Sequence, residues 1–206
     1  MKRRGALFVL SAPSGAGKST LIERAVREIP NIWHSVSATT RAPRHYEKED
    51  VHYHFTDQDT FHRMIKEEKF LEWAKVHGEY YGTPAESVDR RLGAGGAVIM
   101  DLDVQGALQV KKRRPETTLI FIMPPSIEEL RKRIEGRRAE TDERIRRRLS
   151  VAEEEMSQRG LYDHVIVNED IEDAFRDLCA IIRECVSAPD GGPEAGSPDA
   201  GREESE

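Results

Sequence analysis

The chain has 206 residues, of which 37% are hydrophobic and 34% are charged, and its formal net charge is −6. This length and composition fit one globular domain with a sizeable core. No apolar run approaches the roughly 20 residues that span a bilayer, and the apolar start ends at Ser11, too early for a secretory signal. The only two cysteines, Cys179 and Cys185, lie in one predicted helix and suit neither a disulfide nor a metal site. We therefore expect a soluble cytoplasmic protein with no membrane partner.

The negative charge is concentrated at the C-terminal end of the chain. Residues 187–206 hold six carboxylates against one basic residue, Arg202, and are rich in glycine, proline and serine. Such a segment has too few apolar groups to offset the entropy lost on ordering, so it is predicted to be a disordered acidic tail. The remaining residues, 1–186, are near neutral with locally clustered basic residues, which favours small anionic ligands over nucleic acid.

Apolar runs followed by helical patterns recur along the chain. The first run, residues 5–11, ends at a glycine-rich loop, and the residues after that loop have apolar side chains at helical spacing. Ser126 and Glu129 form a capping-box pattern before another helical stretch. The further predicted strands and the helices that follow them are 97–103 with 104–112, 118–123 with 126–135, and 164–168 with 170–185. This alternation predicts an α/β fold, a doubly wound parallel sheet with helices on both faces and ligands at the carboxyl ends of the strands.

Two segments depart from this alternation. Residues 33–96 combine a polar arginine-bearing loop, a helix near residues 57–68, a short strand pair around "FLEWAKVHGEYYGT" and a helix from about Pro84. This combination indicates an inserted lobe. Residues 136–160 are so highly charged that we expect little of the segment in the core, which indicates a mobile flap.

The stretch "APSGAGKST" is typical of a phosphate-binding loop although it lacks the first glycine. The usual pattern is G-x-x-x-x-G-K-[ST], and Ala12 stands at its first position. A methyl group is tolerated there if φ stays negative, whereas Gly15 and Gly17 lie deeper in the cradle. The backbone N–H groups bind phosphate, Lys18 adds charge for the β and γ phosphates, and the Ser19 hydroxyl is available to Mg²⁺. An ordinary glycine turn is the alternative, but it does not require lysine and serine at the helix start.

A second group of phosphate-binding residue types occurs in the inserted segment. Arginines bind phosphate through bidentate charge-assisted hydrogen bonds, and tyrosine hydroxyls add contacts without charge. The group comprises Arg41, Arg44, Tyr53 and Tyr81, and the candidate base-reading residues are Ser37, Glu72, Thr83 and Asp103. One carboxylate can accept both N1–H and N2–H₂ of guanine, whereas adenine has a lone pair at N1, so such a site rejects it. Spacing alone does not select these residues from the many other charges.

The order of the motifs resembles that of the guanylate kinase family, whose members phosphorylate GMP with ATP. The similarity covers about residues 5–185, through "SAPSGAGKSTL", "SVSATTRAPR", "FLEWAKVHGEYYGT", "VIMDLDVQGA", "IFIMPPSIEELRKRIEGR" and "VIVNED". It implies ATP and GMP as substrates, dGMP as a further acceptor and Mg²⁺ as the metal, and it leaves a monomer or a homo-oligomer open. It also implies a P-loop nucleoside monophosphate kinase fold with a core of residues 1–34, 96–125 and 159–186, a GMP-binding lobe at 35–95 and a mobile lid at 126–158.

The resemblance further implies roles for individual residues. The ATP-binding set comprises Ala12, Pro13, Ser14, Gly15, Ala16, Gly17, Lys18, Ser19 and Thr20 in the loop, with Arg133 and, near adenine, Asn168. The GMP-binding set comprises Ser37, Glu72, Thr83 and Asp103 around guanine, and Arg41, Arg44, Tyr53 and Tyr81 around the phosphate. The catalytic set comprises Lys18, Arg44, Arg137 and Arg148, and the Mg²⁺ set comprises Ser19 and, through water, Asp101.

Other interpretations stay open. Asp101 and Asp103 could merely cap the following helix, and the lid arginines could form a solvated helix face. No carboxylate or cysteine joins the histidines at a recognised metal-ligand spacing. A sugar-phosphate kinase would need no guanine-binding carboxylate, and a non-catalytic phosphoprotein-binding module would need no intact phosphate loop. The loop "HYEKED" replaces the glycine turn that the resemblance leads us to expect, and Arg138 stands beside Arg137, so either arginine could reach the phosphate.

Overall fold

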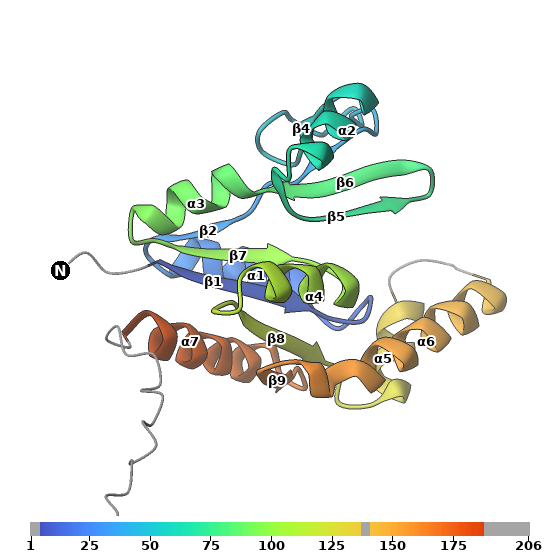
Figure 1. The fold of residues 1–206 in the computed structure, drawn as a ribbon. Helices are drawn as coiled ribbons and strands as arrows, with labels where there is room; N and C mark the ends of the chain where they lie inside the picture. The colour runs from blue at the N-terminus through green and yellow to red at the C-terminus, as the bar shows by residue number, and fades with distance from the viewer. Residues whose placement is uncertain (1–4, 137–140, 188–206) are drawn as a thin grey trace, which may run out of the picture.

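The computed structural model describes residues 5–136 and 141–187, and its centre is a five-stranded parallel sheet (Figure 1). The strands in spatial order are β2 (Ile32–His34), β7 (Ala97–Asp101), β1 (Ala6–Ser11), β8 (Thr118–Met123) and β9 (His164–Val167). The four predicted strands are confirmed, with small differences only at their ends. β2 was not predicted, because three residues give too short an apolar run to be recognised.

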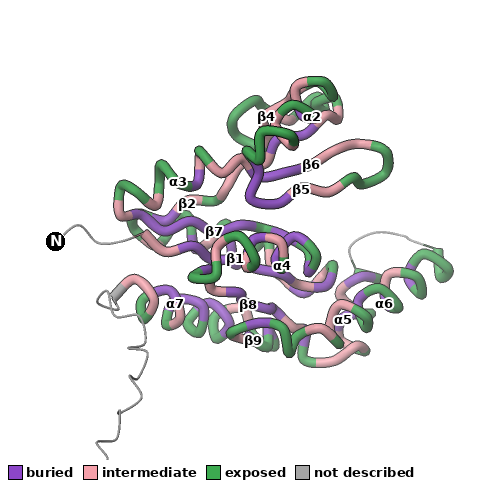
Figure 2. The backbone as a smooth tube through the Cα atoms, in the orientation of Figure 1, coloured by how far each residue is buried: buried purple, intermediate pink, exposed green. Residues whose placement is uncertain are grey.

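Helices cover both faces of the parallel sheet, as predicted. They are α1 (Lys18–Glu28) and α7 (Ile171–Ser187) on one face, and α3 (Ala85–Gly93) and α4 (Val104–Arg113) on the other. Phe8 of β1 packs with α1 and α7, and its neighbour Val9 packs with α3 and α4, because alternate side chains of a strand point to opposite faces. The three inner strands, β7, β1 and β8, are accordingly buried over most of their length (Figure 2). No helix in the described part of the chain is long and apolar enough to cross a membrane.

A second, mixed sheet is formed by the inserted segment and lies to one side of the parallel sheet (Figure 1). Its strands in spatial order are β4 (His54–Phe55), β3 (Ala38–Thr39), β6 (Glu79–Pro84) and β5 (Phe70–Val76), and its helix is α2 (Gln58–Lys66). Phe61 and Phe70 stack with ring centroids 4.4 Å apart and form a small separate core with Ala38. The segment breaks the strand–helix alternation because it builds its own sheet around its own core.

A pair of helices projects beyond the carboxyl end of the parallel sheet (Figure 1). The pair is α5 (Ile127–Glu135) and α6 (Asp142–Ser157), followed by a 3₁₀ turn (Gln158–Leu161). The Ser126 hydroxyl accepts a hydrogen bond of 3.1 Å from the backbone N–H of Glu129, so the predicted helix start is confirmed. The predicted lid arginine Arg137 and its neighbour Arg138 lie outside the described residues, as do residues 188–206 of the predicted tail.

This helix pair contains more core than its charge led us to expect. Ile145 and Leu149 of α6 pack against Leu130 and Ile134 of α5 in a cluster separate from the main core. The apolar side chains lie on one side of α6 among many charged residues, so the high overall charge hides a narrow apolar stripe. The pair can therefore hold its shape as a unit.

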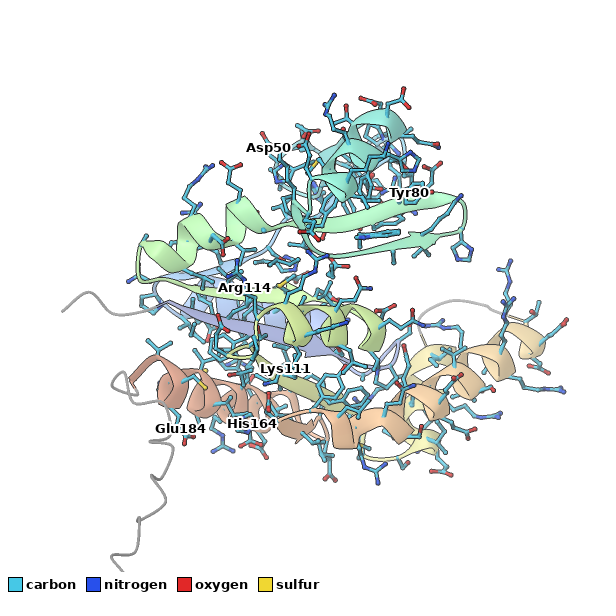
Figure 3. All side chains as sticks on the ribbon, in the orientation of Figure 1. Asp50, Tyr80, Lys111, Arg114, His164 and Glu184 are labelled. Atoms are coloured by element: carbon cyan, nitrogen blue, oxygen red, sulfur yellow. The ribbon has the colours of Figure 1, made fainter. Side chains whose placement is uncertain are left out.

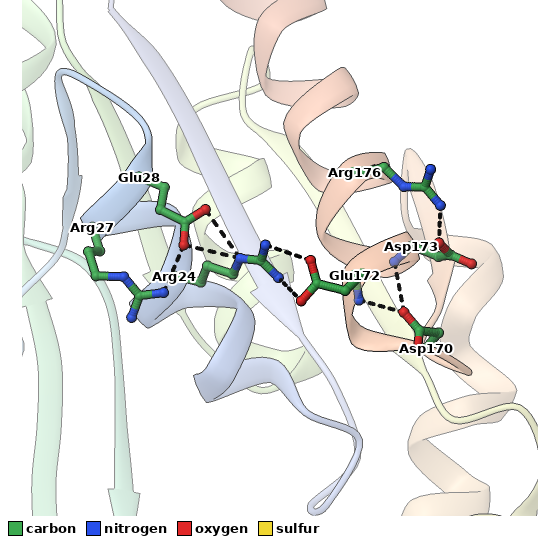
Figure 4. Close-up of polar contacts among 7 residues, drawn as sticks. All are labelled: Arg24, Arg27, Glu28, Asp170, Glu172, Asp173 and Arg176. Atoms are coloured by element: carbon green, nitrogen blue, oxygen red, sulfur yellow. Dashed lines mark hydrogen bonds and ion pairs between the residues drawn. The ribbon is translucent and has the colours of Figure 1, made fainter.

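Arg24 joins α1, the helix after the glycine-rich loop, to α7 through an ion pair with Glu172 (Figure 4). Its guanidinium donates two hydrogen bonds of 2.7 Å to the Glu172 carboxylate and lies 4.1 Å from the ring centroid of Phe175. Asp170 caps the same end of α7 by accepting a hydrogen bond of 2.7 Å from the backbone N–H of Glu172. The start of α7 and the helix that follows the loop are thus held against each other.

Further ion pairs hold α4 at the opposite end of the sheet, where Lys111 and Arg114 lie (Figure 3). Lys111 of α4 donates to the carbonyl of Thr117 at 2.6 Å and to the carboxylate of Asp163 at 3.0 Å. Arg114, which follows α4, pairs with Asp89 of α3 at 2.9 Å. Such partly exposed pairs each add little to the free energy of unfolding, so they mainly fix the positions of the helices.

Candidate active site

The glycine-rich loop joins β1 to α1 at the carboxyl end of the parallel sheet. Gly15 and Gly17 have φ angles of +97° and +96°, conformations that residues with a side chain rarely adopt, and α1 begins directly afterwards at Lys18. Ala12 is not among the described residues with positive φ, and it packs against the main core. The prediction that a methyl group is tolerated at this position is therefore confirmed.

The loop lines a cavity of about 790 Å³. Every predicted loop residue except the buried Ala16 faces this cavity, together with Asp101, Asp103 and Arg148. The five other lining residues were not predicted as site residues: Glu23, His77, Arg147, Val151 and Glu155. The helical spacing of residues 148, 151 and 155 is the signal that could have identified this inner face of α6. Burial raises the pKa of the Glu155 carboxyl above its usual value.

Lys18 is held at the centre of the cavity wall. Its ammonium group forms an ion pair with the Asp101 carboxylate and lies 3.5 Å from the carbonyl oxygen of Leu102. Asp101 is the last residue of β7, which pairs with β1 in a register that places Leu10 beside Asp101. Adjacent parallel strands therefore bring the loop lysine and the "DLD" motif together at one edge of the sheet.

The donor atoms at this edge fit a magnesium ion. Ser19, in the first turn of α1, and Asp101 line the same cavity and offer a hydroxyl and a carboxylate oxygen. Mg²⁺ prefers oxygen ligands, uses one or two carboxylates and keeps several of its waters. A predicted site with Ser19 as direct ligand and Asp101 acting through water is chemically consistent with this set.

The structure brings two carboxylates close to His54, although no recognised metal-ligand spacing connects them in the sequence. Its Nδ1 lies 2.7 Å from the Asp50 carboxylate, and Glu49 is also within reach. Asp50 adopts a positive φ of 61°, which turns the chain back on itself and creates a contact that the spacing does not reveal. The group is largely exposed and distant in sequence from the loop.

The helix pair supplies one predicted arginine to the loop. The Nη2 atom of Arg148 in α6 donates a hydrogen bond of 2.8 Å to the Ser14 hydroxyl. Arg133 in α5 does not line the cavity, and it donates to the backbone carbonyl of Glu169 at 3.4 Å. Of the two predicted lid residues that the structure describes, only Arg148 reaches the loop directly.

Asn168 lies beneath the loop. Its side chain is 4% exposed, and its Nδ2 atom donates a hydrogen bond of 2.7 Å to the backbone carbonyl of Ala16. Asn168 follows β9 at the carboxyl end of the sheet, as the position of "VIVNED" predicts. Its side-chain amide contacts the loop itself.

The predicted base-reading residues come together between the two sheets. The Ser37 hydroxyl lies 3.2 Å from the Thr83 hydroxyl, which donates a hydrogen bond of 2.7 Å to the Glu72 carboxylate. Glu72 and Thr83 are cross-strand partners in β5 and β6, and β3 pairs with β6 immediately after Ser37. Glu72 is 6% exposed, and burial raises the pKa of its carboxyl, with the nearby Asp103 adding to the effect.

Asp103 caps the following helix, as one of the two interpretations of the sequence predicted, and its guanine-binding role stays a prediction. Its carboxylate caps α4 by accepting a hydrogen bond of 2.8 Å from the backbone N–H of Gly106. It also lines the cavity and lies close enough to Glu72 to raise the pKa of that carboxyl. A Cβ atom on Gly106 would lie 3.5 Å from the Glu72 carboxylate, so a side chain there would narrow the approach to the base-reading cluster.

The predicted phosphate-binding residues are brought together only in part. Arg41 Nε donates to the Tyr81 hydroxyl at 3.2 Å, and its guanidinium carbon lies 5.5 Å from the ring centroid of Tyr53. Tyr81 lies two residues before Thr83 in β6, on the same face of the strand, so the phosphate-binding cluster adjoins the base-reading one. The guanidinium of Arg44 donates instead to the hydroxyl of Tyr46, at 2.9 Å.

Glu47 organises this cluster and was not predicted. Its carboxylate accepts two hydrogen bonds from the Arg41 guanidinium, at 2.8 and 3.0 Å, and a third of 2.7 Å from the backbone N–H of Arg44. These contacts lower the pKa of Glu47 to about 2, so the carboxylate stays ionised at every pH at which the protein would be assayed. A bidentate pair of this kind fixes the plane of the arginine.

Replacing Glu47 with glutamine is expected to raise the KM for the acceptor about tenfold with a smaller change in kcat. An amide accepts through one oxygen only, so the Arg41 guanidinium loses its fixed orientation and the loop around Arg44 loosens. Steady-state kinetics with the acceptor varied at saturating ATP would measure the effect. Glu49→Gln is the matched control, and equal KM values in the two variants would contradict the assigned role.

The cavity of the loop adjoins the predicted base-reading cluster, because Asp103 lines the cavity and lies near Glu72. A phosphate-binding loop on a doubly wound sheet, next to a second site for a phosphate and a base, defines a P-loop kinase whose acceptor is itself phosphorylated.

Comparison with known proteins narrows this class to one family. The model of the guanylate kinase family matches residues 4–185. A guanylate kinase of Rubrobacter xylanophilus is 46% identical over 188 residues, covering 91% of this chain and 98% of the relative. A guanylate kinase of Myxococcus xanthus is 47% identical and covers 86% of each chain. The crystal structure of guanylate kinase from Anaplasma phagocytophilum is similar at a TM-score of 0.68 and 37% identity, covering 89% of this chain and 87% of that one. The chain belongs to the guanylate kinase family.

Proposed function

We propose that this protein transfers the γ-phosphoryl group of ATP to GMP, and also to dGMP, with ADP and GDP or dGDP as products. The observation that carries the proposal is the buried Glu72 carboxylate, oriented by Thr83 and lying beside the Arg41 phosphate site. One carboxylate can accept N1–H and N2–H₂ of guanine, and it repels the N1 lone pair of adenine. Family membership supports the same reaction.

The donor side of the site is built from the loop and the helix pair. In our proposal the loop backbone binds the phosphates of ATP, and Lys18 and Arg148 neutralise charge on the transferred group. Arg148 already contacts the loop through Ser14. The proposed ATP-binding residues are Ala12, Pro13, Ser14, Gly15, Ala16, Gly17, Lys18, Ser19, Thr20, Arg133 and Asn168, with Arg137 as a further catalytic residue.

The acceptor side is built from the second sheet. Arg41 with Tyr53 and Tyr81 forms the proposed site for the GMP phosphate, and Arg44 joins it by turning from Tyr46 when the anion binds. This rearrangement is available because Arg44 is exposed and its partner is a neutral hydroxyl. Ser37, Glu72, Thr83 and Asp103 form the proposed guanine site.

Mg²⁺ is the proposed metal, with Ser19 as a direct ligand and Asp101 acting through water. When bound, it supplies positive charge against the β and γ phosphates. Lys18, which pairs with Asp101 in this structure, would exchange that carboxylate for phosphate oxygens. The acceptor needs no general base, because the second pKa of a phosphate monoester is about 6 and its oxygen is already ionised at neutral pH.

The proposed division of the protein into a core and two moving parts is based on the separate hydrophobic cores of the second sheet and of the α5–α6 pair. We propose that residues 35–95 form the GMP-binding lobe and residues 126–158 the lid, both closing over a core of residues 1–34, 96–125 and 159–186. The separate core clusters of the second sheet and the α5–α6 pair support this division, because each part can move as a unit. Closure would exclude water and so suppress hydrolysis of ATP.

A coupled assay of ADP formation tests the proposal. GMP, dGMP, AMP and ribose bisphosphate would each be offered as acceptor with MgATP, and ADP release without acceptor would be the blank. We expect high rates with GMP and dGMP and rates near the blank with AMP. If ribose bisphosphate were the best acceptor, the protein would be a sugar-phosphate kinase, and no rate above the blank with any acceptor would indicate a binding module.

A further inference from the structure

The side chain of Asn168 holds a backbone carbonyl of the phosphate-binding loop. Its Nδ2 donates to the Ala16 carbonyl at 2.7 Å, and its backbone N–H donates to the carbonyl of Met123 at 2.7 Å. Met123 is the last residue of β8. The asparagine is therefore anchored to the sheet at one end and to the loop at the other.

Two glycines of the loop leave room for neighbouring side chains. A Cβ atom on Gly17 would lie 2.2 Å from Nδ2 of Asn168, so the loop can approach the asparagine only because residue 17 is glycine. A Cβ atom on Gly15 would lie 3.3 Å from a methyl group of Leu130 in α5. Close packing against Asn168 and the positive φ angle thus require glycine at position 17, whereas at position 15 the positive φ angle is the main reason for glycine.

The backbone next to Asn168 meets the other parts of the site. Arg133 of α5 donates to the Glu169 carbonyl, and Asp170 caps α7, the helix that Arg24 ties to α1. The segment of residues 168–170 thus contacts the loop and the helix pair, and it leads into α7, which Arg24 joins to the helix that follows the loop.

We propose that Asn168 is a positioning residue for the phosphate-binding loop: by holding the Ala16 carbonyl away from the cavity, it keeps the adjacent loop N–H groups directed at the phosphates. This proposal rests on the proposed ATP site and deepens it. It differs from an adenine contact, because it acts on the triphosphate whatever base is attached. Ala16 is fully buried, so its carbonyl has no access to bulk water in this structure.

Removing the amide therefore leaves a buried carbonyl without its partner. The loop must then either turn that carbonyl toward water, which moves its N–H groups, or keep an unsatisfied acceptor. The expected loss of affinity for a triphosphate is about 10- to 100-fold, the size typical of an unsatisfied buried group.

The test compares ATP with inorganic tripolyphosphate, which has the phosphates and no base. Dissociation constants for both would be measured by calorimetry with Mg²⁺ on the wild type, Asn168→Ala, Asn168→Asp and the control Glu169→Gln. In the alanine variant and in the aspartate variant, we expect the affinity for ATP and the affinity for tripolyphosphate to fall by the same factor. The control should bind both ligands as tightly as the wild type. The aspartate tests the donor itself, because it keeps the shape of asparagine and replaces the amide with a carboxylate. Kinetics should show a raised KM for ATP and an unchanged KM for GMP.

Two results would overturn the proposal and leave the proposed function intact. A loss confined to ATP would assign Asn168 to adenine, and wild-type affinity for tripolyphosphate in Asn168→Asp would remove any role for the donor. Circular dichroism melts would identify a misfolded variant, in which case the other variant decides. Failure of the wild-type protein to bind either ligand would instead reject the ATP site, and with it the proposed function.

Discussion

Replacing Lys18 with alanine is expected to lower kcat about 10³-fold, with little change in the KM for GMP. The lysine ammonium is the one loop side chain that adds full positive charge at the proposed position of the transferred phosphoryl group, and interactions aimed at developing charge typically supply effects of this size. Its contacts in the described structure are the ion pair with Asp101 and the carbonyl of Leu102. The Lys18 and Asp101 side chains are 18% and 33% exposed, so their ion pair is partly hydrated and contributes little to the free energy of unfolding.

Steady-state kinetics and circular dichroism melts would separate catalysis from folding in this variant. Lys112→Ala is the matched control, because Lys112 is an exposed lysine at the far end of α4. We expect both variants to melt close to the wild type and only Lys18→Ala to lose turnover. Turnover near that of the wild type in Lys18→Ala would mean that the cavity does not hold the transferred phosphate.

Most of the parallel sheet could be predicted from the sequence, because its strands are uninterrupted apolar runs with polar ends. β8 consists of the run "TLIFIM", and the predicted range is the same as that of the strand. β3 and β4 have only two residues each and β2 three, too few for a periodic pattern. These short strands exist because longer neighbours pair with them, which is tertiary information.

In the candidate site, too, one part could be predicted from the sequence and another could not. The loop is contiguous, so its motif could be read directly from the sequence. The hydrogen bond between Ser37 and Thr83 spans 46 positions and depends on the pairing of β3 with β6, so only the family resemblance pointed to it. Glu47 is one of three carboxylates in residues 47–50, and nothing in its spacing distinguishes it. A turn in which the Glu47 N–H donates to the Arg44 carbonyl at 3.0 Å directs it toward Arg41.

Glu72 is a buried carboxylate whose environment disfavours its charged form. Its carboxylate is 6% exposed, and it accepts a hydrogen bond from a neutral hydroxyl and no cation among the contacts that the structure describes. A buried carboxylate without a cation is costly, which is why the pKa of Glu72 is raised. In the proposed function, guanine supplies the two N–H donors that this carboxylate lacks, which explains why such a costly group is kept.

Replacing Glu72 with glutamine is therefore expected to lower kcat/KM for GMP about 10³-fold or more and to raise the melting temperature at neutral pH. The amide oxygen still accepts from Thr83, but the group can no longer accept both guanine donors, and one amide N–H would face guanine N1–H. KM for ATP should be unchanged. Glu86→Gln, an exposed change on α3, is the matched control.

The pH dependence of the melting temperature, compared between the wild type and Glu72→Gln, gives a second, independent measurement. A carboxyl whose pKa is raised on folding stabilises the fold below its unfolded pKa of about 4.3, and this contribution is lost as the pH rises through the folded pKa. The gain in melting temperature from Glu72→Gln should therefore be largest at neutral pH and shrink toward pH 4. In the wild type, kcat/KM for GMP should fall as the pH drops toward the folded pKa, because the neutral acid no longer attracts both N–H groups. A flat stability difference across this range, or wild-type selectivity for GMP over AMP in the variant, would contradict the assignment of Glu72 as the guanine-binding carboxylate.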